Sequence, residues 1–325
     1  MFLGIDVSKA TLDVALIKDQ KKPRHKVFAN TATGHQQLLR WLQDNEAHPV
    51  HACLEATGTY GEAAALALHE ADHTASVVNP AQVYHFAQTR LCRTKTDKVD
   101  AQSIAKFCQM YQPPTWTPPA PKTRTLQALV RRLDSLLEMQ TTEKNRFAAG
   151  SNSQEVNTSI QSVLAFLERE IAAIKAQIRE HIDSHPDLKE QRDLLTSIPG
   201  IAHTSAAAIL AELGEVSQFA GGRQVAAFAG LVPKIRQSGS SVRGRAMLSK
   251  RGSSRLRHSL YFPAMTALRC NPLLRALRER LLEKGKAKML ILGAAMRKLL
   301  VIAYGVLRSG KPFDPNFAAK AVQIT

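Results

Sequence analysis

The stretch FLGIDVSKATLDVALIK, residues 2–18, decides the fold of the N-terminal part of the chain. Its apolar residues predict two short strands, over residues 2–6 and 11–18, with Leu12, Val14 and Leu16 on one face of the second. HKVFAN, residues 25–30, predicts a third strand. Three consecutive strands with short connections predict an antiparallel meander, and the first of them ends in a carboxylate, Asp6.

After the meander, helical and strand patterns alternate. We expect helices over residues 31–45, 61–71, 81–88 and 97–111, and strands over 50–57 and 74–80. The order βββαβαβα predicts an α/β domain over residues 1–115, because parallel strands need crossover helices of this size. In such a sheet the first and fourth strands are neighbours.

The remainder of the chain is predicted to be mainly helical. A Pro-rich connector, residues 112–123, leads into a middle region, 116–184, with long charged helices over 124–148 and 154–184. They are expected to form a coiled-coil-like hairpin or dimer arm, or a plain two-helix spacer. A mainly α C-terminal domain is predicted over 185–325. Its segment 194–214 resembles a helix-hairpin-helix, which binds phosphate through backbone N–H groups, or is a simple pair of helices.

Net charge is the strongest global signal. A charge of +17 and a pI near 10.0 predict a polyanionic partner, and nucleic acid fits best. No Asp or Glu occurs between Glu215 and Glu279, although Lys and Arg are frequent there. A block of one sign predicts a phosphate-binding surface. The candidate nucleic-acid-binding residues are Lys234, Arg236, Ser240, Ser241, Arg243, Arg245, Lys250, Arg251, Arg255 and Arg257.

Membrane insertion and disulfide chemistry are not expected. The long apolar stretch near the C-terminus is interrupted by Arg297 and Lys298. The four cysteines show no CxxC pairing, so reduced thiols are predicted. We therefore expect a cytoplasmic protein associated with the nucleoid, without a membrane partner.

Four carboxylates form the candidate metal site. Asp6 and Glu55 end neighbouring strands, and Asp97 and Asp100 share one helical turn. Such a cluster needs a cation, since mutual repulsion would otherwise protonate some of its members. Mg²⁺ or Mn²⁺ suits an all-oxygen set, and two such ions clamp the attacking and leaving oxygens of a phosphodiester. The alternative is local: Asp97 begins a helix, Asp6 caps a turn and Glu55 pairs with a surface Lys.

A Gly/Ser/Arg loop, QSGSSVRGRAMLSKRG at 237–252, offers hydroxyl nucleophiles. Attack by Ser238, Ser240 or Ser241 would form a phosphoserine–DNA ester that conserves bond energy for rejoining. The alternative is a loop whose serines only hydrogen-bond phosphate.

Several motifs resemble the IS110/IS116/IS902 family of insertion-sequence transposases. They are GIDVSKATLDV (4–14), EATGTYGE (55–62), NPAQVYHFAQ (79–88), KTDKVDAQSIA (95–105), SIPGIAHTSAAAILAELG (197–214), VAAFAGLVP (225–233) and SGSSVRGRAMLSKRG (238–252). The resemblance implies a RuvC-like (RNase H-fold) domain with the metal set Asp6, Glu55, Asp97 and Asp100. It also implies a C-terminal transposase domain with Ser238 as nucleophile, and a structured non-coding guide RNA that pairs with donor and target DNA.

Three functions follow as hypotheses. The first is an RNA-guided DNA recombinase that uses metal and serine. The second is a metal-dependent endonuclease of Holliday-junction type with passive serines, and the third is a non-catalytic nucleic-acid-binding protein. Strand exchange needs several active sites held together, so a homo-oligomer, dimer or tetramer, is expected for the first.

Overall fold

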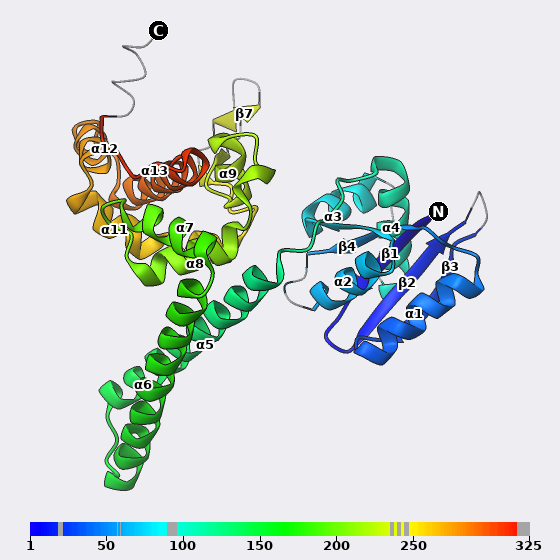
Figure 1. The fold of residues 1–325 in the computed structure, drawn as a ribbon, viewed down its shortest axis with the longest axis horizontal. Coiled ribbons are helices and arrows are strands. Elements are labelled where there is room, and N and C mark those ends of the chain that lie inside the picture. Colours follow the sequence, from blue (N-terminus) through cyan, green and yellow to red (C-terminus); the bar gives the residue numbers. More distant parts are fainter. Residues whose placement is uncertain are drawn as a thin grey trace. The chain divides into compact units, whose positions relative to one another are not determined.

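The computed structural model describes residues 1–18, 22–56, 58, 60–89, 96–234, 237–238, 242–243 and 247–316. The chain divides into two compact units, Met1–Pro118 and Pro119–Thr325, and each is described by itself. The first is a mixed α/β unit, and the second is mostly helical (Figure 1).

The first unit is built on one five-stranded sheet. Its strands are β1 (Phe2–Val7), β2 (Thr11–Ile17), β3 (Arg24–Ala29), β4 (His51–Glu55) and β5 (Thr74–Val78). The strand order is β3-β2-β1-β4-β5. β1, β2 and β3 pair antiparallel, whereas β4 lies parallel to β1 and β5 parallel to β4. The predicted meander and the predicted pairing of the first and fourth strands are both confirmed.

Helices cover both faces of this sheet. On one face, α1 (Ala32–Asp44) and α2 (Glu62–Glu70) contribute to a core that includes Leu3, Ile5 and Leu54. On the other face, α3 (Pro80–Thr89) and α4 (Asp97–Tyr111) pack around Cys53, Ile104 and other apolar side chains. Both faces of the sheet are therefore covered by helices and shielded from solvent, which explains why β2 is buried along almost its whole length.

The backbone of α4 lies directly against β1. A Cβ added to Gly4 would stand 2.2 Å from the carbonyl oxygen of Ala101 and 2.2 Å from the nitrogen of Ala105. Only a residue without a side chain permits this approach. Gly4 thus fixes the distance between the sheet and α4.

A Pro-rich connector follows α4 and is held along β5. The Ser76 hydroxyl donates to the carbonyls of Pro113 and Pro114, and the Trp116 amide donates to the Ala75 carbonyl. Helix α5 (Pro121–Ala149) then starts earlier than the predicted residue 124 because Pro121 occupies its first turn, where a missing N–H is no loss.

Helix α5 pairs with α6 (Gln154–Asp183) in a long hairpin (Figure 1). Buried residues of the hairpin, among them Leu126 and Ile182, belong to the same apolar core as the C-terminal helices. The hairpin is therefore part of the second compact unit. A separate middle domain over 116–184 stays a prediction.

The body of the second unit contains short helices around one long one. They are α7 (Pro186–Thr196), α8 (His203–Leu213), the 3₁₀ turn η1 (Val216–Gln218), α9 (Gly222–Phe228), α10 (Ser254–Ser259), α11 (Tyr261–Cys270), α12 (Pro272–Glu283) and α13 (Lys288–Ser309). Two-residue strands form two antiparallel pairs, β6 (Pro233–Lys234) with β9 (Met247–Leu248), and β7 (Gln237–Ser238) with β8 (Val242–Arg243).

Helix α13 is long and apolar enough to cross a membrane by length and composition, with a mean hydropathy of 1.8 over its most apolar window. However, 56% of that window is buried in the second unit, where Leu299, Leu300 and Ala303 are completely covered. α13 is the central core helix of this unit.

The contact between Gly4 and α4 generates the first prediction. Gly4→Ala should displace α4, lowering the free energy of unfolding by roughly 1–3 kcal/mol as in other overpacked cores. Urea denaturation measures this change. Gly61→Ala is the matched control, because the nearest atom to its added Cβ would be the Val7 Cγ2 at an ordinary 3.7 Å. Equal stability of the two variants would contradict the proposed constraint.

Candidate active site and nucleic-acid interface

Three carboxylates gather at one end of the sheet. Asp6, near the end of β1, is in register with Asp13 on β2. On the other side, Ile5 is in register with Leu54, so Glu55 follows next to Asp6. Because side chains alternate between faces, Asp6 shares a face with Gly4, which is the face covered by α4.

The first turn of α4 brings two further carboxylates to this face. Asp97 and Asp100 open the helix, and the Thr96 hydroxyl caps it by accepting from the Val99 amide at 3.3 Å. The local interpretation of this stretch as a helix start is thus correct in part, with Thr96 as the N-cap. α4 contacts β1, β2 and β4, and the Gly4 contact lies at Ala101, one residue beyond Asp100.

Negative charge is crowded around Asp6. Burial and the neighbouring charges of Asp100, Asp97 and Asp13 raise the pKa of the Asp6 carboxyl from 3.8 to about 6. The three named neighbours come from a different strand and from α4, so the sheet and helix do assemble an acidic region. On the neighbouring strand, the pKa of the Cys53 thiol is raised by its hydrogen bond with Cys108 and by burial, and the charge of Glu55 adds to that rise.

The donor set of this region fits a hard divalent cation. All the acids offer oxygen only, and a cation would relieve the repulsion that raises the Asp6 pKa. Within the described ranges, no three His, Cys, Asp or Glu side chains are already close enough to one another to hold a metal ion. The carboxylates are therefore near one another, but their side chains are not arranged as a complete set of metal ligands.

Asp13 is the acidic residue that sequence reasoning missed. Its carboxylate is 2.9 Å from the Nε2 atom of His25 on β3, and both side chains are mostly buried. The feature that could have revealed it is the hairpin between β1 and β2, because its register places Asp13 opposite Asp6. Like charges directly opposite each other in a sheet are destabilising, so Asp13 adds to the repulsion at Asp6.

The loops behind Asp6 and Glu55 are tied together by one side chain. The Asn30 amide donates to the carbonyl of Ser8 at 2.9 Å and to that of Tyr60 at 3.0 Å. Its oxygen lies 2.9 Å from Nε2 of His35, and burial lowers the pKa of this histidine. These bonds fix the chain just after both acid-bearing strands.

The serine loop lies only partly in the described ranges. Ser238 belongs to β7 and is in register with Val242 of β8, and the backbone of Arg243 follows in the same strand. The side chains of Ser238 and Arg243, and all of Arg236, Ser240, Ser241 and Arg245, lie outside the described part of the chain.

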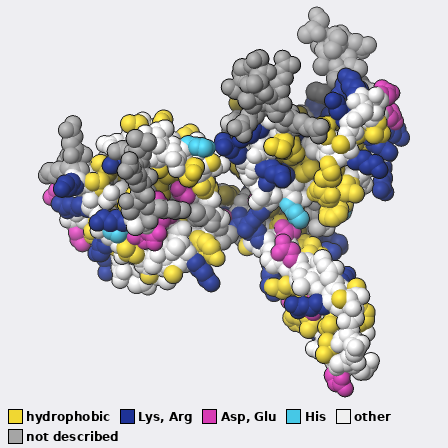
Figure 2. Space-filling view, turned by 180° about the vertical axis from the view of Figure 1, so that it is seen from behind, with side chains coloured by type: hydrophobic (Ala, Val, Ile, Leu, Met, Phe, Trp, Pro, Cys, Tyr) yellow, Lys and Arg dark blue, Asp and Glu magenta, His cyan; other side chains and the backbone are white. Residues whose placement is uncertain are grey.

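The described members of the predicted phosphate-binding set differ in their surroundings. Lys234, Lys250 and Arg251 are exposed. Arg257 instead donates to the backbone carbonyls of Ala229 and Lys250, at 3.0 and 3.4 Å, and so supports the loop. Figure 2 shows Lys and Arg side chains in several groups on one face of the second unit.

Arg255 has acidic neighbours. Burial raises the pKa of Glu212, and the charges of Arg131 and Arg255 oppose that rise. Burial likewise raises the pKa of Asp134, against the charges of His258 and Arg255. Part of the Arg255 charge is thus balanced by these two acids, although its side chain is exposed like those of Lys234, Lys250 and Arg251.

The helix-hairpin-helix candidate consists of α7, a Pro-Gly turn and α8. Gly200 has φ +107°, and a Cβ there would stand 2.6 Å from that of Ala267 on α11. The first residues of α8 have no side-chain cap, which leaves backbone N–H groups at its start. Binding of phosphate at this turn stays a prediction.

Comparisons with known proteins agree with this arrangement. Residues 3–149 match a family model described as Transposase, and residues 192–279 match one described as Transposase IS116/IS110/IS902 family. The pilin gene-inverting protein of Moraxella bovis is 32% identical over 316 residues, covering 96% of this chain and 97% of that protein. The corresponding protein of Moraxella lacunata is 31% identical over the same shares. The transposase for insertion sequence element IS1111A of Coxiella burnetii is 34% identical over 90 residues, 28% of this chain and 24% of that protein.

An α/β unit with carboxylates gathered at one end of its sheet, joined to a basic helical unit, together with these relatives, defines a DNA recombinase of the transposase class. The chain belongs to the IS116/IS110/IS902 family of transposases. Its substrate is accordingly DNA.

Charge crowding at Asp6 generates the second prediction. Asp6→Asn should stabilise the metal-free protein at neutral pH. A carboxyl whose pKa rises to about 6 costs up to about 3 kcal/mol, and screening at a half-buried site reduces this to about 1–2 kcal/mol. The advantage should shrink as the pH falls through about 6, where the folded wild type takes up its proton before the unfolded chain does at 3.8. Urea unfolding in EDTA measures both effects. A destabilised variant would show that Asp6 is not crowded by negative charge.

Proposed function

We propose that the chain cleaves and rejoins DNA strands with two cooperating groups of residues, a carboxylate site in the first unit and a serine in the second. The observation that carries this proposal is the close approach of α4 to β1 at Gly4, which brings Asp97 and Asp100 from a distant part of the sequence to the strand that carries Asp6. Burial and the charges of these neighbours accordingly raise the pKa of the Asp6 carboxyl. Carboxylates forced together in a nucleic-acid enzyme are typical of phosphodiester chemistry with divalent ions.

The first unit is, in this proposal, an RNase H-like domain of the RuvC-like type. The strand order β3-β2-β1-β4-β5, with an antiparallel meander followed by two parallel strands, supports it. Asp6, Glu55, Asp97 and Asp100 would hold Mg²⁺ or Mn²⁺. Asp13, which is in register with Asp6, would be available as a further carboxylate ligand. The ion, when bound, would stabilise negative charge on the phosphate oxygens.

The protein's own residues have distinct tasks. Gly4 holds α4 at the distance that places Asp97 and Asp100 over β1, and Asn30 fixes the loops after Asp6 and Glu55. Ser238 supplies the nucleophile: its oxygen bonds to phosphorus, a sugar oxygen leaves, and the hydroxyl proton passes to solvent or to a carboxylate. The resulting ester is then attacked by a sugar hydroxyl of the second strand, which restores the serine.

The substrate is proposed to be a pair of DNA sites. The two Moraxella relatives carry the name of a gene-inverting protein, and inversion requires two cleaved duplexes. A homo-oligomer that acts in the cytoplasm on nucleoid DNA meets this requirement. A structured guide RNA that pairs with donor and target DNA belongs to the same proposal, and the acid-free basic block would bind its backbone as well as that of DNA.

The third prediction separates the two groups of residues. Asp100→Asn should abolish strand cleavage and leave nucleic-acid affinity within about twofold, since it removes a metal ligand but no phosphate contact. Ser238→Ala should abolish a covalent protein–DNA adduct that denaturing gels detect after reaction with a radiolabelled strand. If Ser238→Ala still forms the adduct, another serine is the nucleophile. Cleavage without any adduct in the wild type would indicate an endonuclease instead.

The fourth prediction concerns the basic block. Each cation that neutralises a phosphate adds about 0.9 to the slope of log affinity against log salt on duplex DNA. Replacing Arg243 and Arg245 together with Ala should flatten this slope by up to about 2. Fluorescence anisotropy over a salt series measures it, with Arg257→Ala as a comparison that acts mainly on stability. An unchanged slope would place Arg243 and Arg245 away from the backbone.

A further inference from the structure

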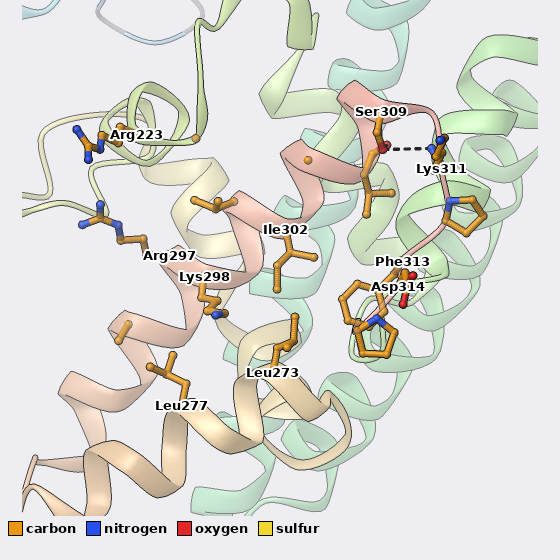
Figure 3. Close-up of a pocket in the computed structure, with 17 residues that line it drawn as sticks. Arg223, Leu273, Leu277, Arg297, Lys298, Ile302, Ser309, Lys311, Phe313 and Asp314 are labelled. Atoms are coloured by element: carbon orange, nitrogen blue, oxygen red, sulfur yellow. Dashed lines mark hydrogen bonds between the residues drawn. The ribbon is translucent and has the colours of Figure 1, made fainter. Parts of the chain in front are cut away.

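Two cavities of the second unit have similar volumes but different linings. The first, of about 750 Å³, runs along α13 and is bounded largely by apolar side chains such as Leu273 and Ile302 (Figure 3). The second, of about 710 Å³, is lined by the C-terminal part of α6, by α7 and by the start of α8, which contact one another. We call it the α6–α8 pocket, and its charged lining consists of Lys175, Arg179, Asp183, Lys189 and Arg192. Cavities of about 300–1,000 Å³ hold small molecules.

The charge of the α6–α8 pocket is unbalanced. Its lining has four cations and one carboxylate, Asp183, which leaves an excess of three positive charges. The Arg192 guanidinium is buried and donates to Asp183 and Asp193, so its charge is already paired. In the described part of the chain, none of the other three cations forms an ion pair. Lys175, Arg179 and Lys189 therefore remain available to an anionic ligand.

The cations of the pocket come from two helices. Lys175 and Arg179 are four residues apart on α6, so they lie on one face of that helix. Lys189 and Arg192 are three residues apart on α7 and likewise share a face. Members of both pairs act on Asp183: the hydrogen bond from Arg192 is the main cause that lowers the pKa of this carboxyl, and the charges of Lys189 and Arg179 lower it further. The pocket thus collects positive charge from both helices.

The start of α8 adds backbone donors to these cations. His203 and Thr204, its first two residues, line the pocket and are exposed. The helix has no side-chain cap, and within the described ranges the amides of His203, Thr204 and Ser205 donate to no acceptor. The N-terminus of a helix carries partial positive charge, and its N–H groups donate to anions. The side chains and the helix end therefore favour the same ligand, a compact group of high negative charge.

We propose that the α6–α8 pocket binds the 5′-triphosphate of a nucleotide, either free or at the first residue of an RNA strand. An internal phosphodiester carries one negative charge and continues into the strand on both sides, which suits an open surface. A terminal triphosphate concentrates several charges in one group that can enter a cavity. Lys175 and Arg179, about 6 Å apart along α6, can contact successive phosphate groups, and Lys189 approaches from α7. The amides of α8 donate to the remaining oxygens.

The RNA-borne form of this ligand rests on the proposed function, because the guide RNA belongs to that proposal. Transcription starts an RNA with a 5′-triphosphate, whereas a strand that a nuclease has cut lacks one. The pocket would therefore select the unprocessed start of a transcript. It also lies outside the acid-free basic block between Glu215 and Glu279, so binding of the strand end and binding of the backbone can be measured apart.

The first test measures nucleotide binding by the full chain without nucleic acid, from the anisotropy of a fluorescent GTP analogue at low salt. Lys175→Gln and Lys189→Gln together should weaken binding by about tenfold or more, because two charge-assisted contacts are lost. The matched control is Lys144→Gln with Lys284→Gln. It removes the same charge from exposed lysines that do not line the pocket, and should change the affinity by less than about twofold. Thermal melting verifies that each variant folds.

The second test concerns the backbone donors of α8. His203→Pro removes one N–H at the first helical position, where proline is tolerated, and Ala202 before it already has the extended conformation that proline requires (φ −95°, ψ 169°). His203→Ala removes the same side chain and keeps the N–H. The proline variant should bind the GTP analogue about threefold or more weakly than the alanine variant. Equal affinities of the two variants would contradict the part assigned to α8.

The third test separates the two sources of the ligand. RNA oligonucleotides of one sequence, with a 5′-triphosphate or a 5′-hydroxyl, are compared on the wild type and on the Lys175→Gln, Lys189→Gln variant. A preference for the triphosphate that the variant loses would identify the RNA end as the ligand. Binding of the GTP analogue without such a preference would identify the free nucleotide. A wild type that does not bind the analogue, or pocket and control variants that lose affinity equally, would overturn the proposal. Because none of these measurements involves cleavage, failure here and failure of the proposed catalysis are distinguishable.

Discussion

The backbone contact between Gly4 and α4 is the constraint on which the first unit depends. A helix usually rests on a sheet through a layer of apolar side chains. Here the Ala101 carbonyl and the Ala105 nitrogen come so near to Gly4 that no Cβ fits between them. This contact places the first turn of α4, with two carboxylates, over the strand that carries Asp6. The architecture thus gives up side-chain packing at one point in order to bring charges together.

Stability and the proposed catalysis oppose each other at the same place. Asp6 faces Asp13 in the neighbouring strand and Asp97 and Asp100 above it, and the protein tolerates this repulsion through the dry cores on both faces of the sheet. The second unit shows a related balance. Burial raises the pKa of Glu212 against the charges of Arg131 and Arg255, and that of Asp134 against the charges of His258 and Arg255, so cations of the helical unit also stabilise its own half-buried acids.

Sequence patterns predicted the parts of this structure that follow from periodicity and pairing rules. The meander, the neighbouring β1 and β4, and α4 from Asp97 to Tyr111 are confirmed, since apolar spacing and a Thr cap determine them. The position of Asp13 beside Asp6 was not predicted, because it depends on the register of the β1–β2 hairpin, which the alternating pattern of one strand does not reveal. The structural role of Arg257 was not predicted, because charge alone does not distinguish a phosphate ligand from a donor to backbone carbonyls. The Gly/Ser loop has no period at all, so its chemistry rests on the family to which the chain belongs.

The connector between the two units has a consequence for the durability of the chain. Residues as far as Trp116 are hydrogen-bonded along β5, and α5 begins at Pro121. Only Thr117–Ala120 remain outside regular structure or these bonds, and two of the four are proline. Proteases cut domain boundaries where an extended, accessible segment can enter their active site. This boundary offers few residues for that, and two of them are proline. We therefore expect the carboxylates of the first unit and the serine loop of the second to stay on one covalent chain during limited proteolysis at this boundary.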